Sequence, residues 1–273
     1  MIKKYSVLMP LYKHDIPDFF VLAIESMLNQ TIEPNEIVIV CDGELSRELN
    51  RILKEYEEKY DSILKIYRFK KNRGLGLTLA DGISLCSNEI IARMDADDFS
   101  VKERCEKQLK FLNVNKDIDV VGSNVLEFTG TIEEIVSEVN LPQTSEEIEY
   151  FARRRCPIRH PALMYKKSKV LSAGNYNDYR RAQDYDLIVR MILNGSNIYN
   201  IQENLVYMRV DDEFYERRGG IDHVKIILRL KYNFYKLGFY SLIDFIISGL
   251  GNAIISLLPN TIRKTFYKRV LRR

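Results

Sequence analysis

Carboxylates gather at the end of an apolar run in the stretch IIARMDADD, residues 90–98. Three of its last four residues are aspartates, and like charges this close together repel and raise one another's pKa. Such a cluster is favourable where it faces water or where a cation neutralises it. Manganese and magnesium bind through one or two carboxylates together with substrate phosphates. The stretch therefore predicts a divalent metal site with Asp95 and Asp97 as ligands. The alternative is an acid-rich helix start, because Phe99 and Ser100 lead into a helical pattern.

The elements that must position this cluster alternate along the first half of the chain. Short runs rich in β-branched and aromatic residues predict strands at 5–9, 36–41, 63–69 and 89–94. Helix-length segments lie between and after them, at 18–30, 45–60, 76–86 and 101–114. A further strand is predicted at 119–128, and helices dominate from about residue 219 onward. This order is typical of an α/β domain with parallel strands and crossover helices.

In an open α/β sheet, ligands bind at the carboxyl ends of the strands, and the residues there are informative. Pro10 and Tyr12 follow the first strand, Asp42 follows the second, and the run KKNRG with Lys71 and Arg73 follows the third. An aromatic ring, an acceptor for an imide or hydroxyl, basic contacts and a metal together form a site for a nucleoside diphosphate. Each piece alone also fits an ordinary turn, a packed aromatic or a solvated loop.

Two other nucleotide-binding motifs are absent. A dinucleotide site would place G-x-G-x-x-G after the first strand, where this chain has proline and tyrosine. The later Gly74-x-Gly76 lacks the third glycine because residue 79 is leucine, and no Walker A loop is found. The sequence therefore argues against a nicotinamide-dependent enzyme and a P-loop nucleotidase.

The bulk composition fits a folded protein that does not bind nucleic acid. Of its 273 residues, 46% are hydrophobic and 29% charged, and the net charge of +3 is spread over most of the chain. The four cysteines are far apart without a C-x-x-C motif, so we expect reduced thiols in a cytoplasmic protein. The start of the sequence lacks the features of a signal peptide.

The C-terminal part has a separate character. Residues 239–258 contain a single charge, Asp244, and the tail NTIRKTFYKRVLRR that follows Pro259 carries lysine and arginine but no acid. Asp244 and several small or polar residues argue against an ordinary transmembrane helix. An apolar helix with a basic flank predicts an in-plane helix on an anionic leaflet. The alternatives are a helix packed on the domain and a homodimer contact.

The chain resembles the inverting family 2 nucleotide-sugar glycosyltransferases of the GT-A fold, especially those of bacterial capsule and O-antigen synthesis. The resemblance spans about the first 210 residues and rests on six stretches in order: YSVLMPLYK, SMLNQTIEPNEIVIVCDG, KKNRGLGLTLADGISLC, IIARMDADDFSVKERCEKQLKFL, RHPALMYKKSKVLSAGNY and QDYDLIVRM. A lone D-x-D is a weak signal, whereas the ordered series is specific. By resemblance, the uridine would be surrounded by Pro10, Tyr12, Asp42 and Arg73. Arg93 and Asp95 would then lie near the ribose and sugar, and Asp97 on the metal.

The resemblance also supplies a catalytic base. An inverting transfer needs a carboxylate that takes the proton of the acceptor hydroxyl as it attacks the anomeric carbon. In the family this is the second acid of a pair at a helix start, which aligns with Asp184. Gln183 stands where the family has the first acid. Taken alone, Asp184 also fits an N-cap of the helical segment that follows.

Two further motifs, in the later part of the chain, contribute candidate residues. His160 lies in an R-H-P motif that the subgroup shares and is a candidate contact for the diphosphate or the acceptor, whereas a lone histidine is more often structural than a metal ligand or catalyst. Arg217 and Arg218 precede two glycines, so this pair predicts either a mobile loop that closes over a diphosphate or a solvated turn.

These observations predict an α/β, GT-A Rossmann-like domain with a mixed, mainly parallel sheet at 1–215, divided into a nucleotide-sugar side (1–128) and an acceptor side (129–215). A basic, helical, membrane-associating region is expected at 216–273. The predicted activity is metal-dependent transfer of a hexose, glucose before galactose, from a UDP-sugar to a lipid-linked (undecaprenyl-diphosphate) oligosaccharide at the cytoplasmic face of the bacterial inner membrane. The alternatives are an inactive sugar-nucleotide-binding protein, which Gln183 would explain, and haloacid-dehalogenase-like phosphoryl transfer. The latter requires D-x-D-x-[TV] after the first strand, whereas DADDF follows the fourth.

Overall fold

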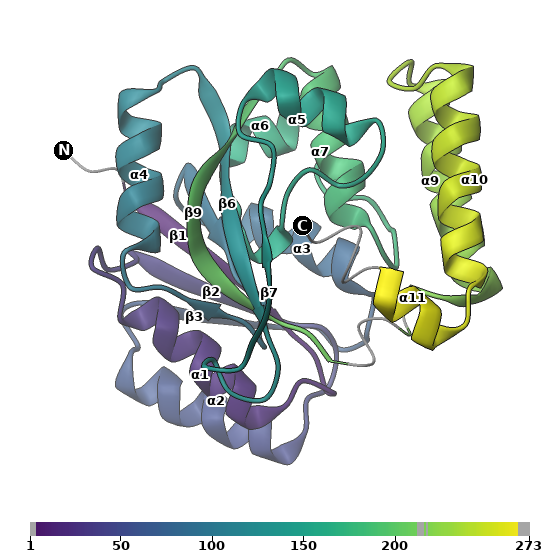
Figure 1. Cartoon of the computed structure of the whole chain (residues 1–273). Coiled ribbons are helices and arrows are strands. Elements are labelled where there is room, and N and C mark those ends of the chain that lie inside the picture. The colour runs from purple at the N-terminus through teal and green to yellow at the C-terminus, as the bar shows by residue number, and fades with distance from the viewer. Residues whose placement is uncertain (1–3, 212–215, 217, 267–273) are drawn as a thin grey trace.

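The computed structural model describes residues 4–211, 216 and 218–266. A central mixed sheet lies between helices, and a helical hairpin stands beside it at the C-terminal end of the chain (Figure 1). The strand order is β3-β2-β1-β4-β8-β6-β9-β5, with β7 paired to β6. The predicted α/β class with a mixed sheet is confirmed.

The first half of the sheet is parallel, as the alternating pattern predicts. Its strands are β1 (Tyr5–Leu11), β2 (Glu36–Cys41), β3 (Leu64–Arg68) and β4 (Ile90–Arg93). They are connected by α1 (Pro17–Leu28), α2 (Arg47–Lys59) and α3 (Leu75–Leu85). Strand β1 pairs in parallel with both β2 and β4, so the carboxyl ends of these strands reach one edge of the sheet.

Alternating side chains of the buried strands divide the interior into two cores. On β1, Val7 and Met9 face one core with α1, α2 and α4 (Arg104–Val114), whereas Leu8 faces a second core with α3 and α7 (Gln183–Leu193). Burial on both faces explains why these strands read as continuous apolar runs rather than as alternating ones. The architecture is therefore a sheet covered by helices on both faces.

The second half of the sheet mixes directions. Its strands are β5 (Phe99–Ser100), β6 (Ile118–Phe128), β7 (Ile135–Val139), β8 (Met164–Lys166) and β9 (Asn197–Arg209). Strand β8 runs antiparallel between β4 and β6, and β9 runs parallel to β6. The short helical elements of this half are α5 (Ser145–Ala152), the 3-10 turn η1 (His160–Ala162) and α6 (Lys167–Ser172).

One boundary prediction is wrong in a way that bears on the site. The helix expected at 101–114 begins only at Arg104, because Phe99 and Ser100 pair with Tyr207 and Val206 of β9. The aspartates at 95–98 therefore precede a strand and do not cap a helix. The acid-rich helix start is thereby excluded as the explanation of the cluster.

The chain continues with α9 (Gly220–Lys236), α10 (Leu242–Leu257) and α11 (Asn260–Phe266). Helices α9 and α10 lie side by side as the hairpin in Figure 1. Leu230 and Phe234 of α9 share a core cluster with Tyr185 and Val189 of α7. The hairpin is thus packed on the helix that begins at Gln183. None of the helices within the described residues is long and apolar enough to cross a membrane.

Candidate active site

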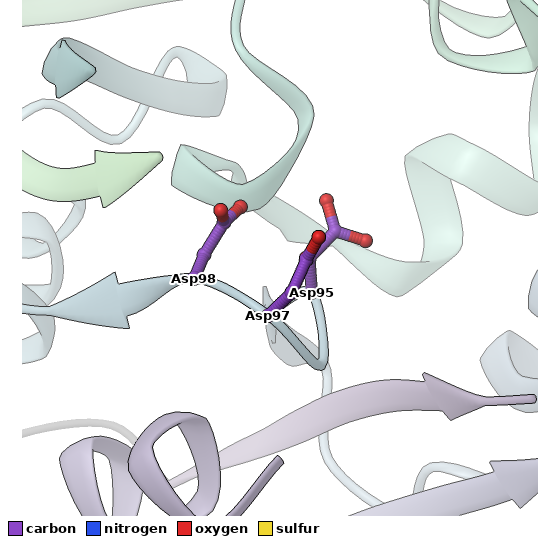
Figure 2. A group of neighbouring side chains, drawn as sticks. All are labelled: Asp95, Asp97 and Asp98. Carbon is purple, nitrogen blue, oxygen red and sulfur yellow. The ribbon is translucent and has the colours of Figure 1, made fainter. Parts of the chain in front are cut away.

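The carboxylate cluster occupies the loop between β4 and β5. Asp95, Asp97 and Asp98 each offer an oxygen, and these oxygens all lie within 4.8 Å of one another. Figure 2 shows the three side chains extending to the same side of the loop. Asp98 is buried and accepts a 2.7 Å hydrogen bond from the backbone N–H of Arg209, whereas Asp95 and Asp97 are partly exposed. Asp98 thus holds the loop to β9, and its two neighbours stay partly accessible to solvent.

The electrostatics of the cluster favour a bound cation. Burial raises the pKa of Asp98 well above its ordinary value, and the charges of Asp97 and Asp95 raise it further. Burial likewise raises the pKa of Asp15 to about 7, with smaller contributions from the same two aspartates. A divalent ion would relieve this repulsion, and carboxylate oxygens are the ligands that manganese and magnesium prefer. The donor set therefore fits such an ion, with Asp95 and Asp97 as the accessible ligands.

Arg93 connects the cluster to the interior. Its side chain is fully buried and forms an ion pair with Asp95. Within the part of the chain that the structure describes, its guanidinium nitrogens have no hydrogen-bond partner in addition to that ion pair. Arg104, also fully buried, donates to the carbonyl oxygen of Arg93 at 2.8 Å and so fixes the end of β4. Because buried donors are costly when unmatched, the Arg93 guanidinium is suited to a polar group that a ligand brings.

On the predicted nucleotide side, Asp42 binds the loop that follows β3. One carboxylate oxygen accepts the Arg73 N–H at 2.7 Å, and the other accepts Gly74 N–H at 3.0 Å and Asn72 Nδ2 at 2.8 Å. Gly43, at φ +89°, allows this approach, since a Cβ there would lie 2.8 Å from Asn72 N. Asp42 therefore shapes the strand edge, and its predicted contact with a base stays a prediction.

The other residues predicted to contact the uridine lie at the same edge. Pro10 is buried in β1, and Tyr12 follows that strand with its ring packed edge-on against His14. The Tyr12 N–H donates to Asp15 at 2.6 Å. The guanidinium of Arg73 pairs with Asp81 of α3, so a role with a nucleotide would require that side chain to move.

Asp184 lies in the first turn of α7, which begins after Ala182 in the left-handed region (φ 61°). Asp184 is therefore not the N-cap residue. Burial raises its pKa, while the Tyr185 N–H and the charges of Arg218 and Arg93 lower it. Its Oδ2 lies 3.8 Å from Cys156 Sγ. Arg93 thus lies within electrostatic range of both Asp184 and the metal-site carboxylates, and the role of Asp184 as the base stays a prediction.

His160 lies in the interior of the protein, next to a tyrosine. The ring is buried, its Nε2 lies 2.8 Å from the Tyr176 hydroxyl, and burial keeps its pKa well below the ordinary value. The Tyr176 hydroxyl thus occupies Nε2, and the predicted contact of His160 with the diphosphate or acceptor stays a prediction. Arg218 is partly buried near Asp184, whereas Arg217 lies outside the described residues.

Sequence reasoning missed several contributors to the site. Asp15, Arg104, Tyr176 and Arg209 all contact or influence the predicted residues. Arg209 donates from Nε to the Asp97 carbonyl at 3.1 Å, and its guanidinium lies 3.6 Å from the centre of the Phe19 ring. The only signal for Asp15 was its place just after the first strand. Arg209 comes from β9, more than a hundred residues from the cluster, so no local pattern identifies it.

Comparison with known proteins decides the family. The profile of Glycosyl transferase family 2 matches residues 6–171, which is more than half of the chain. The chain belongs to this family. Family 2 relatives align over most of it: the UDP-Gal:alpha-D-GlcNAc-diphosphoundecaprenol beta-1,3-galactosyltransferase of Escherichia coli is 34% identical over 99% of this chain and 97% of its own length. The amylovoran biosynthesis glycosyltransferase AmsE of Erwinia amylovora is 32% identical over 86% of this chain and 88% of its own.

Solved structures agree on the fold of this family 2 glycosyltransferase. The S. aureus TarS 1-349 structure in complex with UDP gives a TM-score of 0.61 at 18% identity and covers 97% of this chain and 87% of its own. The mannosyltransferase PcManGT of Pyrobaculum calidifontis, in complex with GDP-Man and Mn2+, gives 0.67 at 13% identity and covers 93% and 70%. The GT-A assignment made from sequence is thereby confirmed.

Proposed function

We propose that this family 2 enzyme is an inverting, metal-dependent hexosyltransferase that uses a UDP-sugar and extends a lipid-linked oligosaccharide for a bacterial surface polysaccharide. Galactose precedes glucose as the proposed donor sugar, because the Escherichia coli relative that aligns over 97% of its own length is named for UDP-Gal. That relative is also named for a diphosphoundecaprenol-linked acceptor, which supports an undecaprenyl-diphosphate carrier here.

One observation carries the proposal: the buried Arg93 interacts both with the metal-site cluster and with the predicted base, Asp184. Arg93 pairs with Asp95 of the metal-site cluster and lowers the pKa of Asp184 across the site. Asp95 and Asp97 would hold the ion, which when bound neutralises negative charge on the departing diphosphate. A donor anchored on one side and a base on the other is the arrangement that inversion needs.

The base role of Asp184 follows from its environment. Its carboxylate takes the proton of the acceptor hydroxyl while that oxygen attacks the anomeric carbon on the face opposite the diphosphate. The C–O bond to the diphosphate breaks as the new C–O bond forms. A pKa raised by burial makes the carboxylate a better proton acceptor, and Arg218 and Arg93 limit that rise.

The test is transfer from UDP-galactose and UDP-glucose to a diphosphate-linked acceptor. Asp184→Asn keeps the shape of the side chain and removes the base, so we expect UDP binding within about 2-fold of wild type and transfer reduced by roughly 10²–10⁴-fold. Asp186→Asn is the matched control, because Asp186 lies in the same helical turn but binds Arg190 at 2.7 Å. Transfer by Asp184→Asn at wild-type rate would assign the base elsewhere. UDP binding without turnover of either donor by wild type would support an inactive binding protein.

The surface of the C-terminal helices supports the proposal that the enzyme binds a membrane. Helix α10 buries polar or small residues and exposes apolar ones: buried are Asp244, Ser248, Gly249 and Ser256, and exposed are Leu242, Ile243, Ile246, Ile247, Leu250, Ile254 and Leu257. Polar contacts attach the helix, since Asp244 pairs with Arg154 at 2.6 Å and Lys231 Nζ donates to the Ser248 carbonyl at 2.7 Å. An apolar outer face on a helix that a basic stretch follows in the sequence fits an anionic cytoplasmic leaflet. In this proposal, residues 1–215 form the catalytic domain, of which 1–128 bind the donor, and residues 216–273 contact the membrane. The alternative is that the apolar face of α10 forms a homodimer contact.

A further inference from the structure

The segment between α6 and α7, residues 173–182, lies directly against the first turn of α3. A Cβ built on Gly76, the second residue of that helix, would lie 2.3 Å from the carbonyl oxygen of Asn177 and 3.3 Å from that of Tyr179. Glycine is the residue that permits such a close approach of two backbones. Because the obstructing atoms belong to the backbone, a side chain at residue 76 would have to displace the α6–α7 segment.

The start of α3 is itself fixed on the predicted donor side. Asp42 accepts the N–H of Arg73 at 2.7 Å and that of Gly74 at 3.0 Å. Gly74, at φ +90°, is the N-cap residue of α3, so this carboxylate holds the first turn of the helix at the carboxyl end of β2. The contact at Gly76 therefore connects the donor side with the segment that precedes Asp184.

Two hydrogen bonds hold the α6–α7 segment in the same place. Asn175 Nδ2 donates to the carbonyl oxygen of Ala80 in α3 at 2.9 Å. The hydroxyl of Tyr179 accepts a hydrogen bond from Asn233 Nδ2 of α9 at 2.5 Å. The segment is thus attached to one helix on the donor side and to one helix of the C-terminal hairpin before it reaches α7.

Both ends of the segment have an uncommon backbone conformation. Of the non-glycine residues that the structure describes, Asn175 (φ 60°) and Ala182 (φ 61°) are the two in the left-handed region. Asparagine tolerates this region, whereas alanine rarely adopts it. Ala182 is the N-cap residue of α7 and precedes Asp184 by two residues. Such strain persists where surrounding contacts determine the backbone, and it gathers at functional sites.

Resting on the proposed function, we infer that Gly76 and Asn175 are positioning residues for the predicted base, Asp184. They hold the α6–α7 segment against α3, and the segment sets the direction in which α7 presents the carboxylate. The distance from the donor to the base is thereby fixed through contact between two backbones. A misplacement of about 1 Å in such a geometry reduces the rate by roughly 100-fold.

The experiment measures kcat for transfer, and Kd for UDP with manganese, in Gly76→Ala and Asn175→Asp. The first variant displaces the segment, and the second removes the donor to Ala80 while keeping a side chain that tolerates the left-handed backbone. We expect kcat to fall by roughly 10- to 100-fold in Gly76→Ala and by about 3- to 10-fold in Asn175→Asp. The Kd for UDP should change by less than about 2-fold in both, because the donor side is untouched. The double variant should be non-additive, since both changes act on one segment.

Two other glycines provide matched controls. Among the described residues, nothing lies within 4 Å of a Cβ built on Gly251 of α10, so Gly251→Ala should behave as wild type. A Cβ on Gly82, on the core side of α3, would lie 2.5 Å from Leu8 Cδ1. Gly82→Ala should therefore lower Tm through overpacking while kcat of the folded protein stays within about 2-fold of wild type. This pair separates a loss of position from a loss of stability.

Wild-type kcat in Gly76→Ala would overturn the inference, and so would an equal loss of kcat in Gly82→Ala. Weakened UDP binding in Gly76→Ala would overturn it too, because the contact would then serve the donor site. If Gly76→Ala does not fold, Asn175→Asp decides the question, and transfer at the wild-type rate in that variant would count against the inference. Failure of the proposed function is a different result, in which Asp184→Asn transfers at the wild-type rate or the wild-type protein does not bind UDP.

Discussion

Replacing exposed apolar residues of α10 should release the protein from anionic membranes. Ile243 and Leu250 lie seven residues apart on one face of the helix and are 68% and 60% exposed. Since neither side chain contributes to a core cluster, the double substitution Ile243→Ser and Leu250→Ser should change the free energy of unfolding by less than about 1 kcal/mol. The fold and the active site therefore stay intact while the outer face becomes polar.

The exposed fractions set the size of the effect. Full burial of a leucine or isoleucine stabilises by about 1.5–3 kcal/mol. With 68% and 60% of the two side chains left to bury, each contributes about 1–2 kcal/mol to membrane binding. The double variant should therefore lose about 2–4 kcal/mol, which is roughly a 30- to 1,000-fold smaller vesicle partition coefficient.

The assay is sedimentation with vesicles of phosphatidylglycerol and phosphatidylethanolamine, with transfer to a short-chain acceptor measured in parallel. Val114→Ser is the control, because Val114 is 79% exposed but ends α4, away from the hairpin in Figure 1. We expect the control to sediment as wild type and the double variant to stay in solution with its transfer rate unchanged. Equal sedimentation of all three proteins would refute the reasoning. A double variant that stays on vesicles but changes from dimer to monomer would assign the face to a second copy of the chain.

Three other predictions test single residues. Asp42→Asn turns an amide group toward the N–H groups that now donate to Asp42. It should therefore lower the free energy of unfolding by about 2–3 kcal/mol and Tm by roughly 5–10 °C in calorimetry. An unchanged Tm would contradict the role of Asp42 in holding the loop after β3. Arg218→Gln removes a charge that lowers the pKa of Asp184, so the acid limb of kcat/KM against pH should move to higher pH, and a limb that stays or moves down would count against it. Asp97→Ala removes an accessible metal ligand, so manganese should no longer strengthen UDP binding; retained manganese dependence would place the ion elsewhere.

The α/β architecture could be predicted because it is encoded locally. Strands buried on both faces read as short apolar runs, and the helices between them carry their own periodicity. The predicted bounds of β2 match the structure, and those of β1, β4 and β6 differ from it by at most two residues at an end. The start of α4 was misplaced because Phe99 and Ser100 pair with a strand more than a hundred residues away, and no local pattern records that pairing.

The site was predictable to a similar, limited extent. The cluster at Asp95 and Asp97 lies within one stretch of sequence, so its spacing indicated a metal. In the folded chain Arg73 pairs with Asp81, and Asp98 accepts a hydrogen bond from the backbone N–H of Arg209. Such contacts arise only when distant segments meet. The sequence likewise indicates α10 only as an apolar run. The structure shows that this helix buries its polar residues and exposes many of its apolar ones.

The most direct test of the central claim is a calorimetric titration of UDP into the wild-type protein, first with manganese and then with a chelator. The account predicts binding with manganese and a loss of at least about 10-fold in affinity with the chelator, because Asp95, Asp97 and the diphosphate would then repel one another. Absence of UDP binding under both conditions would contradict it, and so would equal affinity with and without the metal.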